Sequence, residues 1–298
     1  MCGIVGLFLK DASLEPNLGE LLSAMMITMS DRGPDSAGIA LYGNQQPNLL
    51  KLTLQSPTPD QDFDGLDHLV SKRTRSEVTM KRRDTHGVLF VTSELLLEVR
   101  RALGDLRPSI RLMSTGESIE IYKEVGHPAG VVNRFQLEKM TGTHGIGHTR
   151  MATESIVNTL GAHPFSTGID QCLVHNGSLS NHNSLRRRLI RKGVHFETEN
   201  DSEVAAAYLT HRMSSGATLT QALESGLKDL DGFYTFVIGT RDGFGVMRDP
   251  IACKPAVMAE TDRYVAFGSE YRALVNLPGV DGARIWEPKP ATPYFWVH

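Results

Sequence analysis

The sequence predicts an α+β fold, with helices grouped between runs of strands. Residues 1–10 form an apolar stretch that is typical of a buried strand. Helical periodicity follows this stretch, and short apolar runs between residues 232 and 268 are typical of a strand meander. With 298 residues, of which 40% are hydrophobic and 22% charged, the chain has the composition of an ordinary globular protein.

In the first half, apolar residues recur at spacings of three and four over residues 14–29, which predicts a helix with one buried face. A loop with glycine and proline at 32–38 ends this helix, and its Arg32 and Asp35 are expected near the chain start. Residues 45–64 are polar and contain proline, so a loop is predicted there. The further elements predicted are strands at 39–42, 85–91 and 119–125 and a helix at 93–106 with Ser93 as its N-cap.

In the second half, a strand that begins at Cys172 is predicted to run into a turn at Asn176 and Gly177, because an Asn-Gly pair after an apolar run favours a turn. A helix over 203–214 is predicted to be capped by Asp201 or Ser202. The other elements predicted are helices at 185–192 and 219–230 and strands at 232–239, 245–248, 256–260 and 264–268.

Charge and cysteine content exclude several classes of protein. A net charge of -3 provides no basic field for nucleic acid or anionic lipid. The basic clusters at 72–75 and 81–83 lack interleaved aromatic residues, so they are interpreted as solvated faces. Three cysteines without a CxxC pair predict no disulfide framework and indicate a reducing, cytoplasmic setting. The apolar runs are too short to span a membrane.

The first residues carry a chemical signal of their own. Removal of Met1 would give Cys2 a free α-amino group beside its thiol. A thiolate is a strong nucleophile, and an α-amino group with a pKa of about 7.7–8.0 can accept its proton near neutral pH. The alternative is a small buried cysteine that opens a strand, and these residues alone do not decide between the two.

Five short segments, in order along the chain, resemble the motifs of class II glutamine amidotransferases, a family of N-terminal-nucleophile hydrolases. The segments are MCGIVG at 1–6, RGPDSAG at 32–38, GHTRMAT at 147–153, HNG at 175–177 and DSE at 201–203. Residues 248–255 and 268–270 further resemble the closing strands of amidophosphoribosyltransferase-type members. The resemblance implies a four-layer αββα sandwich with two mainly antiparallel sheets, in a single domain over residues 1–298 with an elaborated insertion at about 51–141.

The resemblance also implies the catalytic groups. Cys2 would attack the side-chain amide of L-glutamine and form a thioester, with its own α-amino group as the base once Met1 is removed. Asn176 and Gly177 would supply the fixed N–H donors that a developing oxyanion needs. Taken alone, an Asn-Gly pair is more simply a turn, so the role of these two residues depends on the resemblance.

Substrate binding is implied in the same way. Arg150 would bind the α-carboxylate of glutamine through two donors, and Asp201 would bind the α-ammonium group. Thr153 and His163 match positions that support the pocket. Taken alone, Arg150 is more simply a surface residue and Asp201 a helix cap.

No cofactor and no metal are expected. Several histidines and one cysteine nevertheless suggest a zinc site as an alternative. They are His144, His148, His163, Cys172 and His175. Their spacing matches no standard zinc motif, so packing is the preferred interpretation.

Family members couple glutamine hydrolysis to a domain that uses ammonia, and the sequence contains no phosphoribosyl-pyrophosphate loop, sugar-isomerase pair or SGGxDS loop. We therefore expect a glutaminase subunit that passes ammonia to a separate synthase subunit, similar to the glutaminase-like subunits of glutamate synthase and N-methylglutamate synthase systems. The alternatives are a catalytically weak, glutamine-binding regulatory subunit and an amide hydrolase for another substrate. Residues 51–141 are either an elaborated flank of the fold or a docking surface for the synthase subunit.

Overall fold

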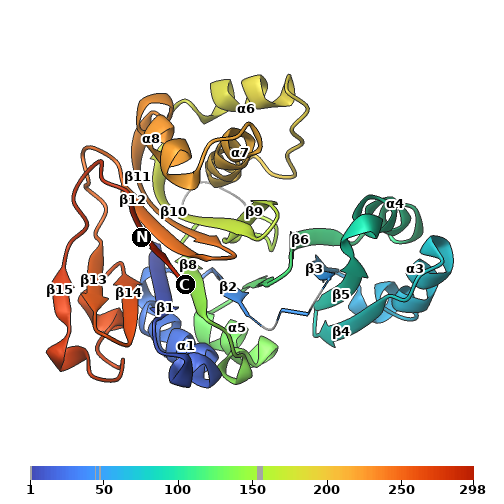
Figure 1. Ribbon diagram of the computed structural model, residues 1–298, viewed down its shortest axis with the longest axis horizontal. Helices are drawn as coiled ribbons and strands as arrows, with labels where there is room; N and C mark the ends of the chain where they lie inside the picture. The colour runs from blue at the N-terminus through green and yellow to red at the C-terminus, as the bar shows by residue number, and fades with distance from the viewer. Residues whose placement is uncertain (1, 44, 47, 153–156) are drawn as a thin grey trace.

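Two sheets form the centre of the protein (Figure 1). The structure is a computed structural model that describes residues 2–43, 45–46, 48–152 and 157–298. The strands of the first sheet are β1 (Gly3–Leu9), β2 (Ser36–Tyr42), β7 (Ile119–Val125), β8 (His144–Arg150), β13 (Val257–Glu260), β14 (Tyr264–Gly268) and β15 (Arg284–Trp286). Those of the second are β9 (Phe165–Gly168), β10 (Gln171–Leu179), β11 (Gly232–Thr240), β12 (Gly243–Arg248) and β16 (Tyr294–Val297). The strand orders are β15-β13-β14-β1-β8-β2-β7 and β16-β12-β11-β10-β9, and neighbouring strands run antiparallel.

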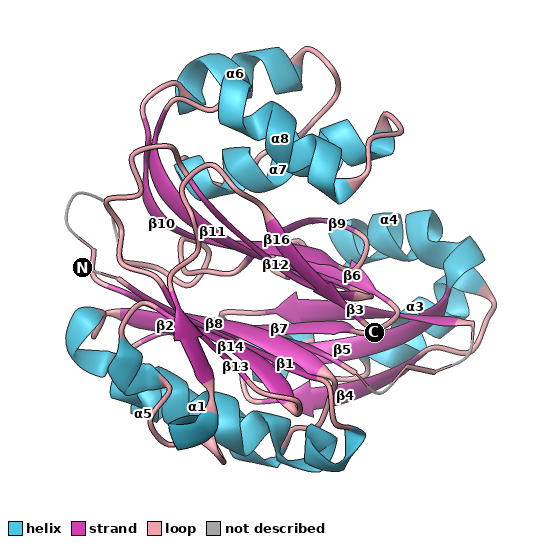
Figure 2. Ribbon diagram, turned by 60° about the vertical axis from the view of Figure 1, so that its left-hand side comes forward, coloured by secondary structure: helices cyan, strands magenta, loops and turns pink. Residues whose placement is uncertain are grey.

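Helices cover the outer face of each sheet (Figure 2). The seven-stranded sheet is covered by α1 (Leu18–Thr28) and α5 (Pro128–Phe135). The five-stranded sheet is covered by α6 (His182–Ile190), α7 (Asp201–Ser214) and α8 (Leu219–Asp229). Among the helices in the described ranges, none has both the length and the apolar character needed to cross a membrane. The layers confirm the predicted αββα sandwich.

Apolar side chains from both sheets fill the space between them. Ile4 and Phe267 from the first sheet pack in one cluster with Val174, Val237 and Phe244 from the second, and all five are buried. Burying such side chains contributes roughly 1.5–3 kcal/mol each, which is why the two inner faces stay together. Because β1 lies in the middle of its sheet, between β14 and β8, the start of the chain is held at the edge of this core.

A third sheet projects to one side of the sandwich (Figure 1). Its order is β4-β5-β3-β6, with β3 (Leu49–Gln55), β4 (Thr79–Arg83), β5 (His86–Thr92) and β6 (Arg111–Gly116). It packs with α2 (Pro59–Asp62), α3 (Leu66–Thr74) and α4 (Leu96–Leu106) around its own apolar cluster, which includes Leu52, Leu66 and Val99. The four-stranded sheet thus has a core of its own.

The prediction of a loop at 45–64 is wrong, because this stretch contains β3 and α2. Leu50, Leu52 and Leu54 alternate along β3 and are buried, but Lys51 and Thr53 between them are buried as well. Both faces of β3 are buried, so the polar residues of this strand do not mark a solvent-exposed face. In the sequence, polar residues within such a strand look like those of a loop.

Three local predictions are also wrong. β10 does not turn at Asn176 and Gly177 but continues to Leu179, paired with β11 throughout. The N-cap of α7 is Asn200, whose side chain accepts a hydrogen bond from the backbone N–H of Ser202 at 2.8 Å. The helix predicted from residue 93 starts as a 3-10 turn and becomes α4 at Leu96, without a Ser93 cap. By contrast, β7 and β14 have the predicted bounds.

Candidate functional site

A cleft of about 1010 Å³ lies where β1 begins, β8 ends and α7 begins. The predicted site residues within the described ranges all line it; they are Cys2, Arg150, His163, Asn176, Gly177 and Asp201. Thr153, predicted to support the pocket, and Met1 lie outside the described residues. Residues from both sheets and from a helix terminus therefore meet in one cavity.

Cys2 is fixed through its backbone. Its carbonyl oxygen accepts hydrogen bonds from Arg32 Nε at 2.9 Å and from Asn176 Nδ2 at 3.1 Å. Its Sγ lies 3.8 Å from the carbonyl oxygen of Met151. The half-buried thiol therefore has a defined position on the cleft wall, while the sandwich core holds the strand behind it.

Arg32 is placed beside the chain start, as the 32–38 loop predicted. Its Nη1 lies 2.5 Å from Oε1 of Glu270, and this ion pair lowers the pKa of the Glu270 carboxyl. Glu270 belongs to the stretch after β14, 238 residues away in sequence. The ion pair therefore braces the guanidinium that holds Cys2. The sequence pointed to Arg32 but gave no partner for it.

Asn176 is held by residues of both sheets. Its Nδ2 donates to the carbonyl of Cys2 and, at 3.3 Å, to Ser269 Oγ, while its Oδ1 lies 3.1 Å from His148 Nε2. The same Ser269 Oγ accepts the backbone N–H of Ile4 at 2.9 Å. These contacts fix the amide orientation and keep its N–H groups on the Cys2 side.

Gly177 follows Asn176 along β10 with φ at +146°, in a region that favours glycine. A β-carbon at this position would lie 1.9 Å from the carbonyl oxygen of Phe233. β9 pairs with β10 at Gln171 and Leu173, so the edge of β10 beyond residue 173 has no neighbouring strand within the described chain. The Leu179 N–H on this edge donates to Asp201 Oδ2, whereas Gly177 before it borders the cleft.

Arg150 ends β8 and is 7% exposed. The backbone around it is braced by Asp35, whose N–H donates to the Arg150 carbonyl at 3.0 Å and whose Oδ2 accepts from Ala152 N–H at 2.8 Å. Gly33 packs so closely on this backbone that an added β-carbon would lie 2.3 Å from the carbonyl carbon of Thr149. The 32–38 loop therefore positions both Cys2, through Arg32, and the end of β8.

Asp201 lies at the first position of α7 with one oxygen directed at the backbone. Its Oδ2 accepts the backbone N–H of Leu179 at 2.9 Å, and its Oδ1 is 3.7 Å from His175 Nδ1. Because Asn200 supplies the helix cap, the Asp201 carboxylate is available on the cleft wall. Asp201 is therefore not the N-cap of α7.

Ser202 joins His163 and His175 behind the cleft. Its Oγ lies 2.8 Å from His163 Nε2 and 2.9 Å from His175 Nδ1. His148 stacks on His163 with ring centroids 4.1 Å apart. Burial lowers the pKa of His148 to about 3, lowers that of His163 well below its usual value and also lowers that of His175. The three imidazoles are therefore neutral near pH 7.

The suggested zinc ligands do not form one group. His144 and Cys172 lie together elsewhere, with Tyr42 stacked on His144 at 4.3 Å and its hydroxyl 3.2 Å from Cys172 Sγ. Within the described ranges, no group of three or more His, Cys, Asp or Glu side chains is arranged to hold a metal ion.

Lys123 is a residue that sequence reasoning missed. It is buried in β7, and its ammonium group donates to the carbonyl oxygens of Leu160, Ala162 and Pro164 at 3.1, 2.7 and 3.2 Å. Burial lowers its pKa to about 8. Lys123 thereby attaches the loop that carries His163 to the seven-stranded sheet. Its sequence context, an ordinary strand lysine, contains no signal for this role.

Known proteins resemble this chain along its whole length. A family model described as a glutamine amidotransferase domain matches residues 148–276. The glutamine amidotransferase-like protein GlxB of Rhizobium meliloti is 65% identical, over 100% of this chain and 99% of that protein. A protein of Methanothermobacter thermautotrophicus, named as a candidate glutamine amidotransferase, is 34% identical over 92% of this chain and 93% of its own length.

The fold also matches a solved structure, the glutamine phosphoribosylpyrophosphate amidotransferase of B. subtilis complexed with ADP and GMP. The TM-score is 0.63 at 19% identity, over 99% of this chain and 47% of that chain. At this identity the likeness concerns the fold alone. The two full-length relatives and the matched domain show that the chain belongs to the class II glutamine amidotransferase family.

Proposed function

We propose that the protein hydrolyses the side-chain amide of L-glutamine at Cys2 and passes the ammonia to a separate synthase subunit. The observation that supports this most is the convergence of a thiol, an oriented amide donor, a guanidinium and a carboxylate in one cleft; these groups belong to Cys2, Asn176, Arg150 and Asp201. Such a set meets the needs of amide hydrolysis on a zwitterionic amino acid.

The reaction starts once Met1 has been removed. The free α-amino group of Cys2 takes the thiol proton, and the thiolate attacks the side-chain carbonyl carbon of glutamine. The negative charge that develops on the carbonyl oxygen is stabilised by the Gly177 N–H and by Asn176 Nδ2, which exchanges its 3.3 Å bond to Ser269 Oγ for one to the oxyanion. The C–N bond then breaks, and the α-ammonium group of Cys2 returns its proton to the leaving ammonia. Water hydrolyses the resulting thioester to glutamate and the free thiol.

Two opposite charges select the substrate. Arg150 offers two parallel N–H donors to the α-carboxylate, and Asp201 offers a carboxylate oxygen to the α-ammonium. His175 lies 3.7 Å from this carboxylate and is neutral near pH 7, so it does not compete with the substrate ammonium for the Asp201 charge. An amide that lacks the α-amino and α-carboxyl groups would therefore bind weakly.

Replacing the nucleophile tests the proposal. Cys2→Ala should abolish ammonia release from glutamine while glutamine binding, measured by calorimetry, persists. Cys253→Ala removes an exposed cysteine outside the cleft and serves as the matched control with full activity. Intact mass should show that Met1 is absent in active protein. Full activity of Cys2→Ala, or of protein that retains Met1, would overturn the mechanism.

The ammonia acceptor needs a separate experiment. Affinity purification from the source cells should recover a synthase subunit, and adding it should raise the rate of glutamine hydrolysis. If the purified wild-type protein binds glutamine but releases no ammonia even with that subunit, the catalytically weak regulatory role is favoured instead.

A further inference from the structure

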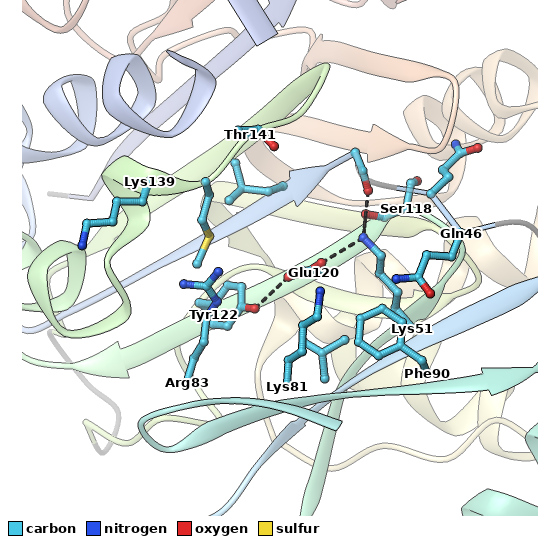
Figure 3. Close-up of a pocket in the computed structure, with 15 residues that line it drawn as sticks. Gln46, Lys51, Lys81, Arg83, Phe90, Ser118, Glu120, Tyr122, Lys139 and Thr141 are labelled. Atoms are coloured by element: carbon cyan, nitrogen blue, oxygen red, sulfur yellow. Dashed lines mark hydrogen bonds and ion pairs between the residues drawn. The ribbon is translucent and has the colours of Figure 1, made fainter. Parts of the chain in front are cut away.

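A second cavity, of about 470 Å³, lies where the four-stranded sheet meets the seven-stranded sheet (Figure 3). Among the residues that the structure describes, none lines both this cavity and the Cys2 cleft. Its walls come from β3, β4 and β5 on one side and from β7 on the other. The volume is in the range of about 300–1,000 Å³ that is usual for small-molecule sites.

Basic side chains dominate this cavity. Lys51, Lys81, Arg83 and Lys139 line it, whereas Glu120 is the one carboxylate among the described lining residues. Lys81 and Arg83 are two residues apart on β4, so their side chains lie on the same face of the strand, and both extend toward Glu120 (Figure 3). The basic cluster at 81–83 is therefore solvated only in part: Lys81 and Arg82 are exposed, and Arg82 pairs with Asp60, whereas Arg83 is half-buried.

The Glu120 carboxylate is already satisfied by the protein. Its Oε1 lies 2.8 Å from Lys51 Nζ, and its Oε2 accepts the Tyr122 hydroxyl at 2.7 Å. Lys51 is 2% exposed and also donates to the carbonyl of Gly43 at 2.8 Å. The base of the cavity is thus a closed, neutral pair that contributes no net charge.

The other three basic side chains of the cavity have no carboxylate partner among the described residues. Lys81, Arg83 and Lys139 form no ion pair with any residue in the described ranges. Aromatic rings support two of them, with the Lys81 ammonium 5.3 Å from the Phe90 ring centroid and the Arg83 guanidinium 5.9 Å from that of Tyr122. The Lys139 ammonium is directed away from the other cations (Figure 3) and donates to Gln136 Oε1 at 3.2 Å. The charges of Lys81 and Arg83 lie on the same face of β4 and repel one another unless an anion lies between them.

We infer that this cavity binds a small anion with two or more negative charges, either a phosphorylated compound or a polycarboxylate. Arginine presents a planar fork to phosphate or carboxylate oxygens, and lysine supplies point charges beside it. The apolar and aromatic lining, which includes Phe90 and Tyr122, suits the carbon skeleton of such a compound. A bound anion would lie between β4 and the wall formed by β7, and hence between the four-stranded sheet and the sandwich.

Two probe anions test the inference on the full-length protein. Pyrophosphate represents phosphorylated compounds and citrate represents polycarboxylates, each titrated by calorimetry against chloride at equal ionic strength. At least one probe should bind with a stoichiometry of one and raise the melting temperature, because a ligand that binds only the folded state stabilises it. The tighter of the two identifies the class.

Charge-removing variants locate the site. The double variant Lys81→Gln/Arg83→Gln should weaken probe binding by at least about tenfold, since two charge-assisted contacts are lost. Lys72→Gln removes a positive charge from the exposed surface of α3, outside the cavity, and should bind as the wild type does.

Three results would overturn the inference: neither probe binds better than chloride, the double variant binds like the wild type, or Lys72→Gln loses as much affinity as the double variant. Melting curves without any probe show whether each variant is folded. The glutaminase proposal does not depend on this outcome, because no described residue lines both cavities.

Discussion

His148 and Asn176 join the two sheets of the sandwich at the Cys2 cleft. His148 lies in β8 and Asn176 in β10, and the His148 Nε2 and Asn176 Oδ1 atoms are 3.1 Å apart. Since the amide oxygen accepts, Nε2 carries the imidazole proton, and burial lowers the His148 pKa to about 3, so the ring is neutral near pH 7. His148 therefore acts as a positioning residue that keeps the Asn176 NH₂ group on the Cys2 side.

Replacing His148 should affect the rate of hydrolysis more than substrate binding. His148→Leu removes the donor to Asn176 and lets its amide rotate, so kcat for glutamine hydrolysis should fall by about 10–100-fold, less than the loss of an oxyanion donor itself. KM should change little. His148→Gln places an amide nitrogen near the former Nε2 and should restore much of kcat. Equal loss in both variants would indicate packing rather than positioning.

Gly177 should tolerate no side chain. Gly177→Ala places a β-carbon 1.9 Å from the Phe233 carbonyl oxygen at a φ of +146°. We expect a loss of about 2–5 kcal/mol in the free energy of unfolding, measured by urea denaturation. Gly104→Ala is the matched control, because Gly104 is in α4 with open space around it. That variant should gain about 0.5–1 kcal/mol. An unaffected Gly177→Ala would contradict the described backbone.

Short-range patterns predicted much of the fold. Strands with a strong apolar signal, such as β7 and β14, have their predicted bounds. At Asn176 and Gly177 the local turn signal failed, because pairing with Thr235 and Tyr234 of β11 outweighs the turn preference of the dipeptide. At the start of α7, three successive residues that can cap a helix stand at 200–202, and only their backbone geometry selects Asn200.

The sequence predicts the residues of the cleft that belong to short motifs. It does not predict contacts between residues that are far apart along the chain and meet only in the fold. Cys2, Arg150 and Asp201 stand in recognisable segments and line one cleft. The ion pair of Arg32 with Glu270 joins residues 238 positions apart, and no local pattern announces it. Lys123 is similar, because its three carbonyl partners lie in a loop without a regular pattern.

Asp201 should govern substrate affinity rather than helix stability. In Asp201→Asn the side-chain oxygen can still accept the Leu179 N–H, but the negative charge for the substrate ammonium is gone. KM for glutamine should rise by about 10–150-fold, which corresponds to a charged hydrogen bond of about 1.5–3 kcal/mol. Thr218→Ala removes the N-cap of α8 and should cost about 1 kcal/mol of stability without a change in KM. Unchanged KM in Asp201→Asn would contradict the assignment.

Buried histidines should make the protein less stable in acid. Burial lowers the pKa of His86, His144 and His148 from 6.5 to about 3, so between these values the unfolded chain binds protons that the folded chain does not. The free energy of unfolding should therefore fall as the pH drops below 6.5, by up to about 1.4 kcal/mol per pH unit for each histidine. His86→Gln, in the core beside Phe135, should make this slope shallower by about that amount in urea denaturation at pH 7, 6 and 5. Since the comparison is between slopes, a constant loss of stability in the variant does not affect it, and equal slopes would contradict the prediction.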